Sequence, residues 1–169
     1  HTAVLVSIIV LNLNGALLLP RCLAALLAQS HRNIEVIVVD NGSTDGSRLA
    51  VKEFEEGKEF EGGSRVRWVS TGKNLGCAGG RNFSLGLTRG EVIAFIDNDG
   101  FADPHWIEWA LGVLLSADEV GAVASLVFFD SDKLRINGAG GGINRLGYAS
   151  DLCFNQQYES ALFTESVYF

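Results

Sequence analysis

Apolar segments rich in β-branched residues recur along this chain, and helix-like segments separate them. Strands are expected at Val4–Leu11, Glu35–Val39, Val66–Ser70, Val92–Ile96 and Gly121–Phe129. Helices are expected at Ala16–Gln29, Ser47–Phe60, Ala78–Thr88 and His105–Ser116. Strands that alternate with helices in this way pair in parallel through right-handed crossovers. The alternation therefore predicts an α/β fold with a largely parallel sheet, in which Val92–Ile96 is covered on both faces.

Acidic residues stand at the ends of two of these strands. Asp97-Asn98-Asp99 follows one strand, and Asp40 ends another. In open α/β sheets, ligands bind in the crevice at the carboxyl ends of the strands. Two carboxylates at that edge suit a hard cation such as Mg²⁺ or Mn²⁺, and a single one can accept hydrogen bonds from a ribose or a base. The alternative for each is an acidic turn that only caps its strand, and two acidic strand ends in one sheet weigh against it.

Composition limits the classes of protein and partner. The chain has 169 residues, of which 47% are hydrophobic and 20% are charged, and its formal net charge is −7. These values predict a single globular domain across residues 1–169 and argue against a nucleic acid partner. An acidic protein needs a metal ion, an arginine or a helix N-terminus to hold a phosphorylated ligand. The apolar segment Ala3–Leu13 is too short to span a bilayer, and the widely spaced cysteines indicate reduced thiols.

The segment Gly72–Asn82 joins the third expected strand to the next helix. Its backbone N–H groups, and Arg81 on the opening turn of that helix, are candidates to face a diphosphate. The alternative for Arg81 is a surface salt bridge. The segment is neither a Walker loop nor a Gly-x-Gly-x-x-Gly turn after a first strand, so a nicotinamide-binding fold has little support.

The alternation of strands and helices stops after the fifth expected strand. Lys133–Asn137 and Arg145–Ala149 are expected to pair as a hairpin around the glycines of Gly138–Gly142. Those glycines either let a ligand approach the backbone closely or belong to a surface loop.

Taken in order, these motifs resemble the family-two inverting glycosyltransferases of the GT-A fold, over nearly the whole chain. The matching segments are Val6–Val10, Asn12–Asn14, Ile37–Asp45, Asn74–Gly76, Gly79–Asn82, Gly90-Glu91, Asp97–Asp99 and Pro104. Asn137–Gly142 adds a similarity to rhamnosyltransferase-like members in bacteria. The resemblance implies a Rossmann-like three-layer sandwich around a mostly parallel central sheet. The family's general base, usually in a Glu-Asp pair, is expected beyond Phe169, so the chain is expected to be a C-terminally truncated, donor-binding portion.

The resemblance also implies roles for individual residues. The nucleotide-binding residues that it implies are Leu11, Asn12, Asp40, Arg81 and Asp97. Asp40 would contact the base or the ribose, Asp97 would lie near the ribose and diphosphate, and Arg81 would face the diphosphate. Asp99 would bind the divalent metal, Mg²⁺ or Mn²⁺. Leu13 departs from the family, which often has an aromatic residue there.

The implied activity is the transfer of a sugar, with inversion, from a UDP-, dTDP- or GDP-linked donor to a glycan or lipid-linked acceptor, in cell-surface polysaccharide or glycan synthesis. The expected location is the cytoplasm, with the full-length protein peripheral at the inner face of the membrane. An unfinished sheet edge makes a homodimer a further expectation. The isolated chain is expected to bind the donor without transferring sugar. The alternatives are a non-catalytic nucleotide-sugar-binding module and a nicotinamide-dependent oxidoreductase.

Overall fold

The computed structural model describes residues 4–55, 65–146 and 148–159. The chain divides into two compact units, His1–Glu108 and Trp109–Phe169. The first unit contains a four-stranded sheet in the order β3-β2-β1-β4. Its strands are β1 (Val6–Asn12), β2 (Ile34–Asp40), β3 (Val66–Ser70) and β4 (Val92–Asp97). All three strand pairs are parallel, which confirms the predicted fold class.

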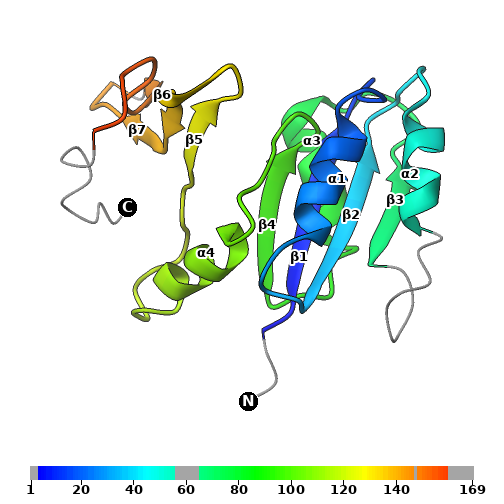
Figure 1. Ribbon diagram of the computed structural model, residues 1–169, viewed down its shortest axis with the longest axis horizontal. Helices are drawn as coiled ribbons and strands as arrows, with labels where there is room; N and C mark the ends of the chain where they lie inside the picture. The colour runs from blue at the N-terminus through cyan, green and yellow to red at the C-terminus, as the bar shows by residue number, and fades with distance from the viewer. Residues whose placement is uncertain (1–3, 56–64, 147, 160–169) are drawn as a thin grey trace. The chain divides into compact units, whose positions relative to one another are not determined.

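Helices cover both faces of this sheet. They are α1 (Leu19–Leu27), α2 (Ser47–Glu55) and α3 (Gly76–Leu85), and α4 (Trp106–Leu114) follows β4 along the chain. In Figure 1, α1 and α2 lie on the face toward the viewer and α3 lies behind the sheet, which gives three layers. Residues 56–60 of the predicted second helix lie outside the described residues. None of the helices in the described parts of the chain is long and apolar enough to cross a membrane.

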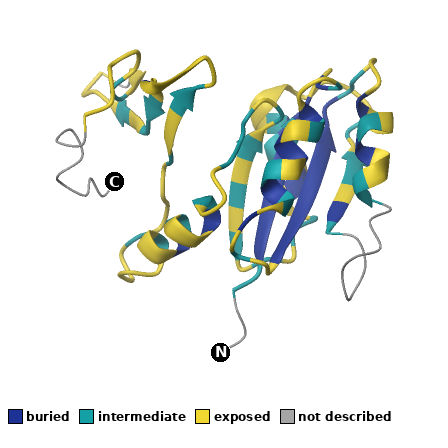
Figure 2. Ribbon diagram, viewed as in Figure 1, coloured by how far each residue is buried: buried dark blue, intermediate teal, exposed yellow. Residues whose placement is uncertain are grey.

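The core of the first unit lies around the two central strands. Figure 2 shows β2 buried along its whole length, and all but Leu11 of β1 is buried as well. From α1, the leucines at the helical spacing of three and four residues, Leu19, Leu23 and Leu26, are 0% exposed. Continuous Val and Ile runs therefore form the central strands because both of their faces meet apolar helix surfaces.

The prediction that β4 is covered on both faces is wrong. Its residues alternate between half-buried and exposed, and Ile93 and Phe95 remain 37% and 43% exposed. β4 is an edge strand of the described sheet, paired only with β1 there. A short apolar run fits a central strand and an edge strand equally well, so the sequence did not distinguish the two.

The second unit consists of short antiparallel pairs. β5 (Leu126–Phe129) pairs with β6 (Asp132–Ala139), and β7 (Gly141–Ile143) pairs with β8 (Ala149–Asp151).

These pairings contradict two predictions. β5 does not join the parallel sheet, because the two residues between β5 and β6 close a local hairpin, whereas parallel pairing needs a long crossover. The predicted hairpin of Lys133–Asn137 with Arg145–Ala149 is also wrong. Gly140 at φ 87° separates β6 from β7, and β7 becomes the partner of β8.

A buried carboxylate links neighbouring strands at the amino-terminal edge of the sheet. Glu35 is 5% exposed, and its Oε1 accepts hydrogen bonds from Ser7 Oγ (2.6 Å) and the backbone N–H of Arg89 (2.7 Å). Arg89 Nε donates to Oε2 at 2.9 Å, and Gly90 N donates to Ser7 Oγ at 2.8 Å. These bonds join β1, β2 and the segment before β4. Burial by itself raises the pKa of Glu35, but the hydrogen bonds from Ser7 and Arg89 together hold that pKa below its ordinary value.

A Glu35→Gln variant is expected to lose about 1–3 kcal/mol of unfolding free energy at pH 7, because hydrogen bonds to a charged group are lost. A carboxyl whose pKa is lower in the folded chain stabilises it above the ordinary pKa, and this contribution disappears as the pH falls through the folded pKa. The difference between the parent and the variant should therefore shrink below about pH 4. Urea unfolding between pH 3 and pH 7 measures it, with Glu119→Gln at an exposed acid as the control. A difference that is constant with pH would contradict this account.

Candidate functional site

The carboxyl ends of β1, β2 and β4 lie together at one edge of the sheet, at the top of Figure 1, beside the first turn of α3. A cleft of about 380 Å³ opens there, within the size range of small-molecule sites. The residues that line it are Leu11, Leu13, Asn41, Asn74, Gly76, Cys77, Asp97, Asn98 and Asp99. Because β1 has β2 on one side and β4 on the other, the cleft lies where the strand order reverses.

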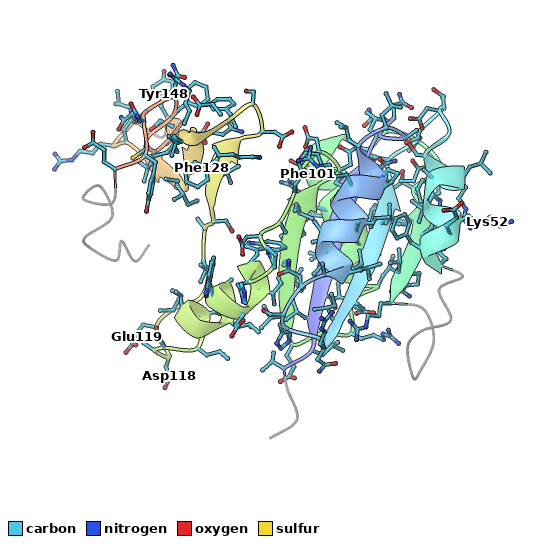
Figure 3. The ribbon with its side chains drawn as sticks, viewed as in Figure 1. Lys52, Phe101, Asp118, Glu119, Phe128 and Tyr148 are labelled. Atoms are coloured by element: carbon cyan, nitrogen blue, oxygen red, sulfur yellow. The ribbon has the colours of Figure 1, made fainter. Side chains whose placement is uncertain are left out.

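One wall of the cleft is formed by residues 97–99, the last residue of β4 and the two that follow it, which we call the acidic turn. Its backbone is held by two hydrogen bonds, from Asn98 N to Leu11 O (3.2 Å) and from Gly100 N to Asp97 O (2.9 Å). Phe101, labelled in Figure 3, follows the turn, and the guanidinium carbon of Arg21 lies 3.7 Å from its ring centroid. The turn is therefore fixed to β1 on one side and to α1 on the other.

The two carboxylates of the acidic turn differ in their partners. Asp97 Oδ1 accepts a hydrogen bond from Arg81 Nη2 at 2.8 Å, whereas Asp99 is exposed to the cleft. Arg81 Nε is buried and has no hydrogen-bond partner among the described residues. Behind the turn, burial raises the pKa of the Cys22 thiol to about 12, and the negative charges of Asp99 and Asp97 add to that effect. The acidic turn thus carries two carboxylates, one of them paired with Arg81.

The opposite wall is the loop between β3 and α3, and a buried amide holds it. Asn41, at the end of β2, donates from Nδ2 to Asn74 Oδ1 and to Gly76 O, both at 3.1 Å. Its Oδ1 accepts from Leu75 N at 2.9 Å. Gly42 lies so close that an added Cβ would be 2.9 Å from Asn74 N. One asparagine therefore satisfies three polar groups of the loop and fixes the wall of the cleft that carries Cys77.

Asp40 and Asn12 lie beneath this edge and are almost fully buried. Asp40 is 6% exposed, and its carboxylate accepts from Ser43 N (3.1 Å) and Ser70 Oγ (3.2 Å). Asn12 is 0% exposed, and its amide is hydrogen-bonded to Ser43 and Asn98.

The structure brings together all six residues that the sequence predicted, at one end of the first unit. Three of them, Leu11, Asp97 and Asp99, line the cleft. The other three, Asn12, Asp40 and Arg81, are not among the lining residues, and their roles as nucleotide contacts stay predictions.

Sequence reasoning missed the structural importance of Asn41 and Asn98. Each directly follows an aspartate at a strand end, and each amide supplies both a donor and an acceptor, which is the signal that would have identified it.

The acidic turn can hold a metal ion that brings its own additional ligands. The described residues contain no cluster of three or more His, Cys, Asp or Glu side chains arranged around a metal position. Mg²⁺ and similar ions are commonly held by one or two carboxylates, with waters and substrate phosphates completing the shell. Asp99, with Asp97 next to it in the cleft, fits that kind of site.

Comparisons with known proteins agree with this geometry. The sequence profile of Glycosyl transferase family 2 matches residues 7–162. An uncharacterized glycosyltransferase of Nostoc sp. is 32% identical over 79% of this chain and 40% of its own length. The Escherichia coli enzyme UDP-Glc:alpha-D-GlcNAc-diphosphoundecaprenol beta-1,3-glucosyltransferase WfgD is 31% identical over 66% of this chain and 41% of its own length.

Among solved structures, the mannosyltransferase PcManGT from Pyrobaculum calidifontis, in complex with GDP-Man and Mn²⁺, superposes with a TM-score of 0.64 and 29% identity. The match covers 75% of this chain and 36% of that one. The matches therefore span less than half the length of each of these three relatives.

Proposed function

Because the chain belongs to glycosyl transferase family 2, we propose that it is the donor-binding part of an enzyme that transfers a sugar from a nucleoside diphosphate to an acceptor hydroxyl, with inversion. The observation on which this rests is the acidic turn, which lines a cleft at the carboxyl ends of three parallel strands. The names of the relatives support it, since one uses a UDP-linked glucose and another is solved with GDP-Man and Mn²⁺. In this proposal the donor is a UDP-, dTDP- or GDP-linked sugar.

Each end of the cleft suits a different part of the donor. Leu11 and Leu13 give an apolar surface for the nucleoside, above the buried Asn12 and Asp40. Asp97 faces the ribose and diphosphate, and Arg81, which contacts Asp97 through Nη2, offers its guanidinium to a phosphate oxygen. In this proposal, one end of the cleft binds the neutral nucleoside of the donor and the other end binds its anionic diphosphate.

Asp99 holds the divalent ion, Mg²⁺ or Mn²⁺, in this proposal. When bound, that ion supplies positive charge at the diphosphate, which offsets the negative charge that develops on the leaving group. Arg81 adds a fixed positive charge on the same side. The acceptor oxygen forms a bond to the anomeric carbon as the bond from that carbon to the diphosphate oxygen breaks. The acceptor proton passes to a carboxylate base, which is a residue other than those assigned to the donor and the metal.

We propose that residues 1–169 belong to one nucleotide-sugar-binding domain. The acceptor is a glycan or a lipid-linked sugar, by analogy with the diphosphoundecaprenol-linked acceptor in the name of the E. coli relative. The whole protein accordingly works in cell-surface polysaccharide or glycan synthesis, in the cytoplasm at the inner face of the membrane.

The experiment that tests the proposal is calorimetric titration of the chain with UDP, dTDP and GDP, each with Mn²⁺ and again with a chelator. At least one nucleotide should bind, and more tightly with the metal. Transfer assays on the whole protein, with the donor sugar linked to that nucleotide, then test the reaction and its stereochemistry. Absence of binding by all three nucleotides in the presence of Mn²⁺ would refute the proposal.

Arg81→Ala tests the division of the cleft into a nucleoside end and a phosphate end. The variant should weaken diphosphate binding by about 1.5–3 kcal/mol, the usual contribution of a charge-assisted hydrogen bond. Binding of the matching nucleoside, which has no phosphate, should change by less than about 0.5 kcal/mol. Arg67→Ala, at an exposed arginine whose Nη2 donates to Leu87 O, is the control. Equal losses for the two ligands would place Arg81 elsewhere than at the diphosphate.

A further inference from the structure

Two side-chain amides connect the acidic turn with the turn after β2. Asn98, the middle residue of the acidic turn, donates from Nδ2 to Asn12 Oδ1 at 2.8 Å. Asn12 then donates from its own Nδ2 to Ser43 Oγ at 3.1 Å. Asn12 is 0% exposed, so the middle of this bridge is buried, and Asn98 at its first end lines the cleft.

The connection continues to the carboxylate at the end of β2. Ser43 donates its backbone N–H to Asp40 Oδ1 at 3.1 Å. Three N–H donors therefore follow one another in the same direction, from the acidic turn to Asp40, across the ends of β4, β1 and β2. An amide suits both middle positions because it offers a donor and an acceptor at once. At position 98 it also adds no third negative charge between Asp97 and Asp99.

The two amides of the bridge leave no room for a side chain at Gly15. A Cβ on Gly15 would lie 2.0 Å from Asn98 Nδ2 and 2.3 Å from Asn12 Oδ1. Gly15 is not among the glycines with positive φ, so its backbone conformation is open to any residue. The glycine is needed for room, because only hydrogen at this position lets the two amides meet.

We propose that Asn12 and Asn98 are positioning residues that fix the distance between the acidic turn and Asp40. The proposal rests on the proposed function, because it concerns a ligand that touches both ends of the cleft. A nucleoside diphosphate with its cation binds at the acidic turn and at the nucleoside end together, and preorganising the two ends lowers the cost of that binding. A ligand that touches only the nucleoside end gains nothing from the bridge.

Gly15→Ala separates the amides while leaving both asparagines in the chain. Affinity for the nucleoside diphosphate that the parent binds, in the presence of Mn²⁺, should fall about tenfold, which corresponds to the loss of one buried hydrogen bond with its alignment. Affinity for the matching nucleoside, measured with a chelator, should stay within about twofold. Asn98→Ala, at a half-buried position, should give the same pair of results.

Gly46→Ala is the matched control. Gly46 O accepts from Leu49 N and Ala50 N at the start of α2, as Gly15 O accepts from Leu18 N and Leu19 N before α1. An added Cβ at Gly46 would meet only Ala16 Cβ, at 3.9 Å. Thermal unfolding of each variant shows how much stability is lost, and calorimetry shows what happens to each ligand.

The outcomes separate the two claims. If the parent binds the diphosphate and both Gly15→Ala and Asn98→Ala bind it equally well, the positioning role is refuted and the proposed function stands. Equal losses for the diphosphate and the nucleoside would also refute it, since a purely structural role weakens both. If the parent binds no nucleotide, the proposed function and the positioning role fall together.

Discussion

Replacing Asp99 by asparagine is expected to remove the metal-dependent part of nucleoside diphosphate binding. The amide keeps the shape of the side chain but loses the charge that a divalent cation requires, and Asp97 is already paired with Arg81 at 2.8 Å. Loss of even an indirect partner of a metal ligand lowers metal affinity by about 10–100-fold, so loss of the ligand itself should cost at least about 100-fold. Calorimetry with Mn²⁺ and with a chelator measures the two affinities, and in the variant they should become equal.

Asp118→Asn is the control for this variant, since Asp118 is an exposed acid of the second unit, labelled in Figure 3. It removes the same charge from the chain without touching the cleft. If Asp99→Asn keeps a large difference between Mn²⁺ and chelator, the metal ligand is another residue. If the parent shows no such difference, its diphosphate binding does not depend on the cation.

Gly90→Ala is expected to destabilise the chain by about 3 kcal/mol, the upper end of the usual range for overpacking. The added Cβ would lie 2.6 Å from Ser7 N, 2.7 Å from Leu5 O and 2.7 Å from Ser7 Oγ. Two of these atoms belong to the backbone of β1 and the residue before it, so they cannot move aside as a flexible side chain would. The hydrogen bond from Gly90 N to Ser7 Oγ, and with it the link to Glu35, would be strained as well.

Urea unfolding at pH 7 measures this loss, and Gly112→Ala is the matched control. Gly112 lies inside α4, and nothing lies within 4 Å of its added Cβ. That substitution should stabilise the helix by about 0.5–1 kcal/mol, because alanine loses less backbone entropy than glycine. A Gly90→Ala variant as stable as the parent would contradict this prediction. It would show that the segment before β4 can shift to accommodate the added Cβ.

The sequence predicted the parallel sheet of the first unit, though not the exposure of β4, because local and global signals agree there. Val and Ile runs, helix-like spacing of leucines and strand-end turns all favour the same parallel sheet, and the register of β1 with β2 brings Asn12 beside Asp40. The second unit was predicted poorly, because β5 is short and its partner was decided by the turn at residues 130–131. A four-residue apolar strand pairs as well with a near neighbour as with a distant sheet, and loop closure favours the near one.

In the candidate site, too, some residues could be predicted from the sequence and others were missed. Asp97 and Asp99 could be predicted because they stand at the end of an apolar strand, and ligands bind at the carboxyl ends of the strands in open α/β sheets. The importance of Asn41, Asn98 and Gly15 was not predicted, because it lies in contacts between segments far apart in the chain, such as the 2.8 Å bond from Asn98 to Asn12. Such contacts follow from the packing of the strand ends and leave no periodic trace in the sequence.

The edge position of β4 has a consequence for hydrogen exchange. β4 is held by β1 alone among the described strands, so one partial opening of the sheet separates β4 from β1 and leaves β3, β2 and β1 paired. The acidic turn leaves with it, and the cleft ceases to exist in that open form. A ligand that contacts both Asp99 and the nucleoside end therefore binds only the closed form and slows exchange of the β4 amides in proportion to its concentration over its dissociation constant. The ligand in this way stabilises the pairing of β4 with β1, which none of the described strands supports from the other side.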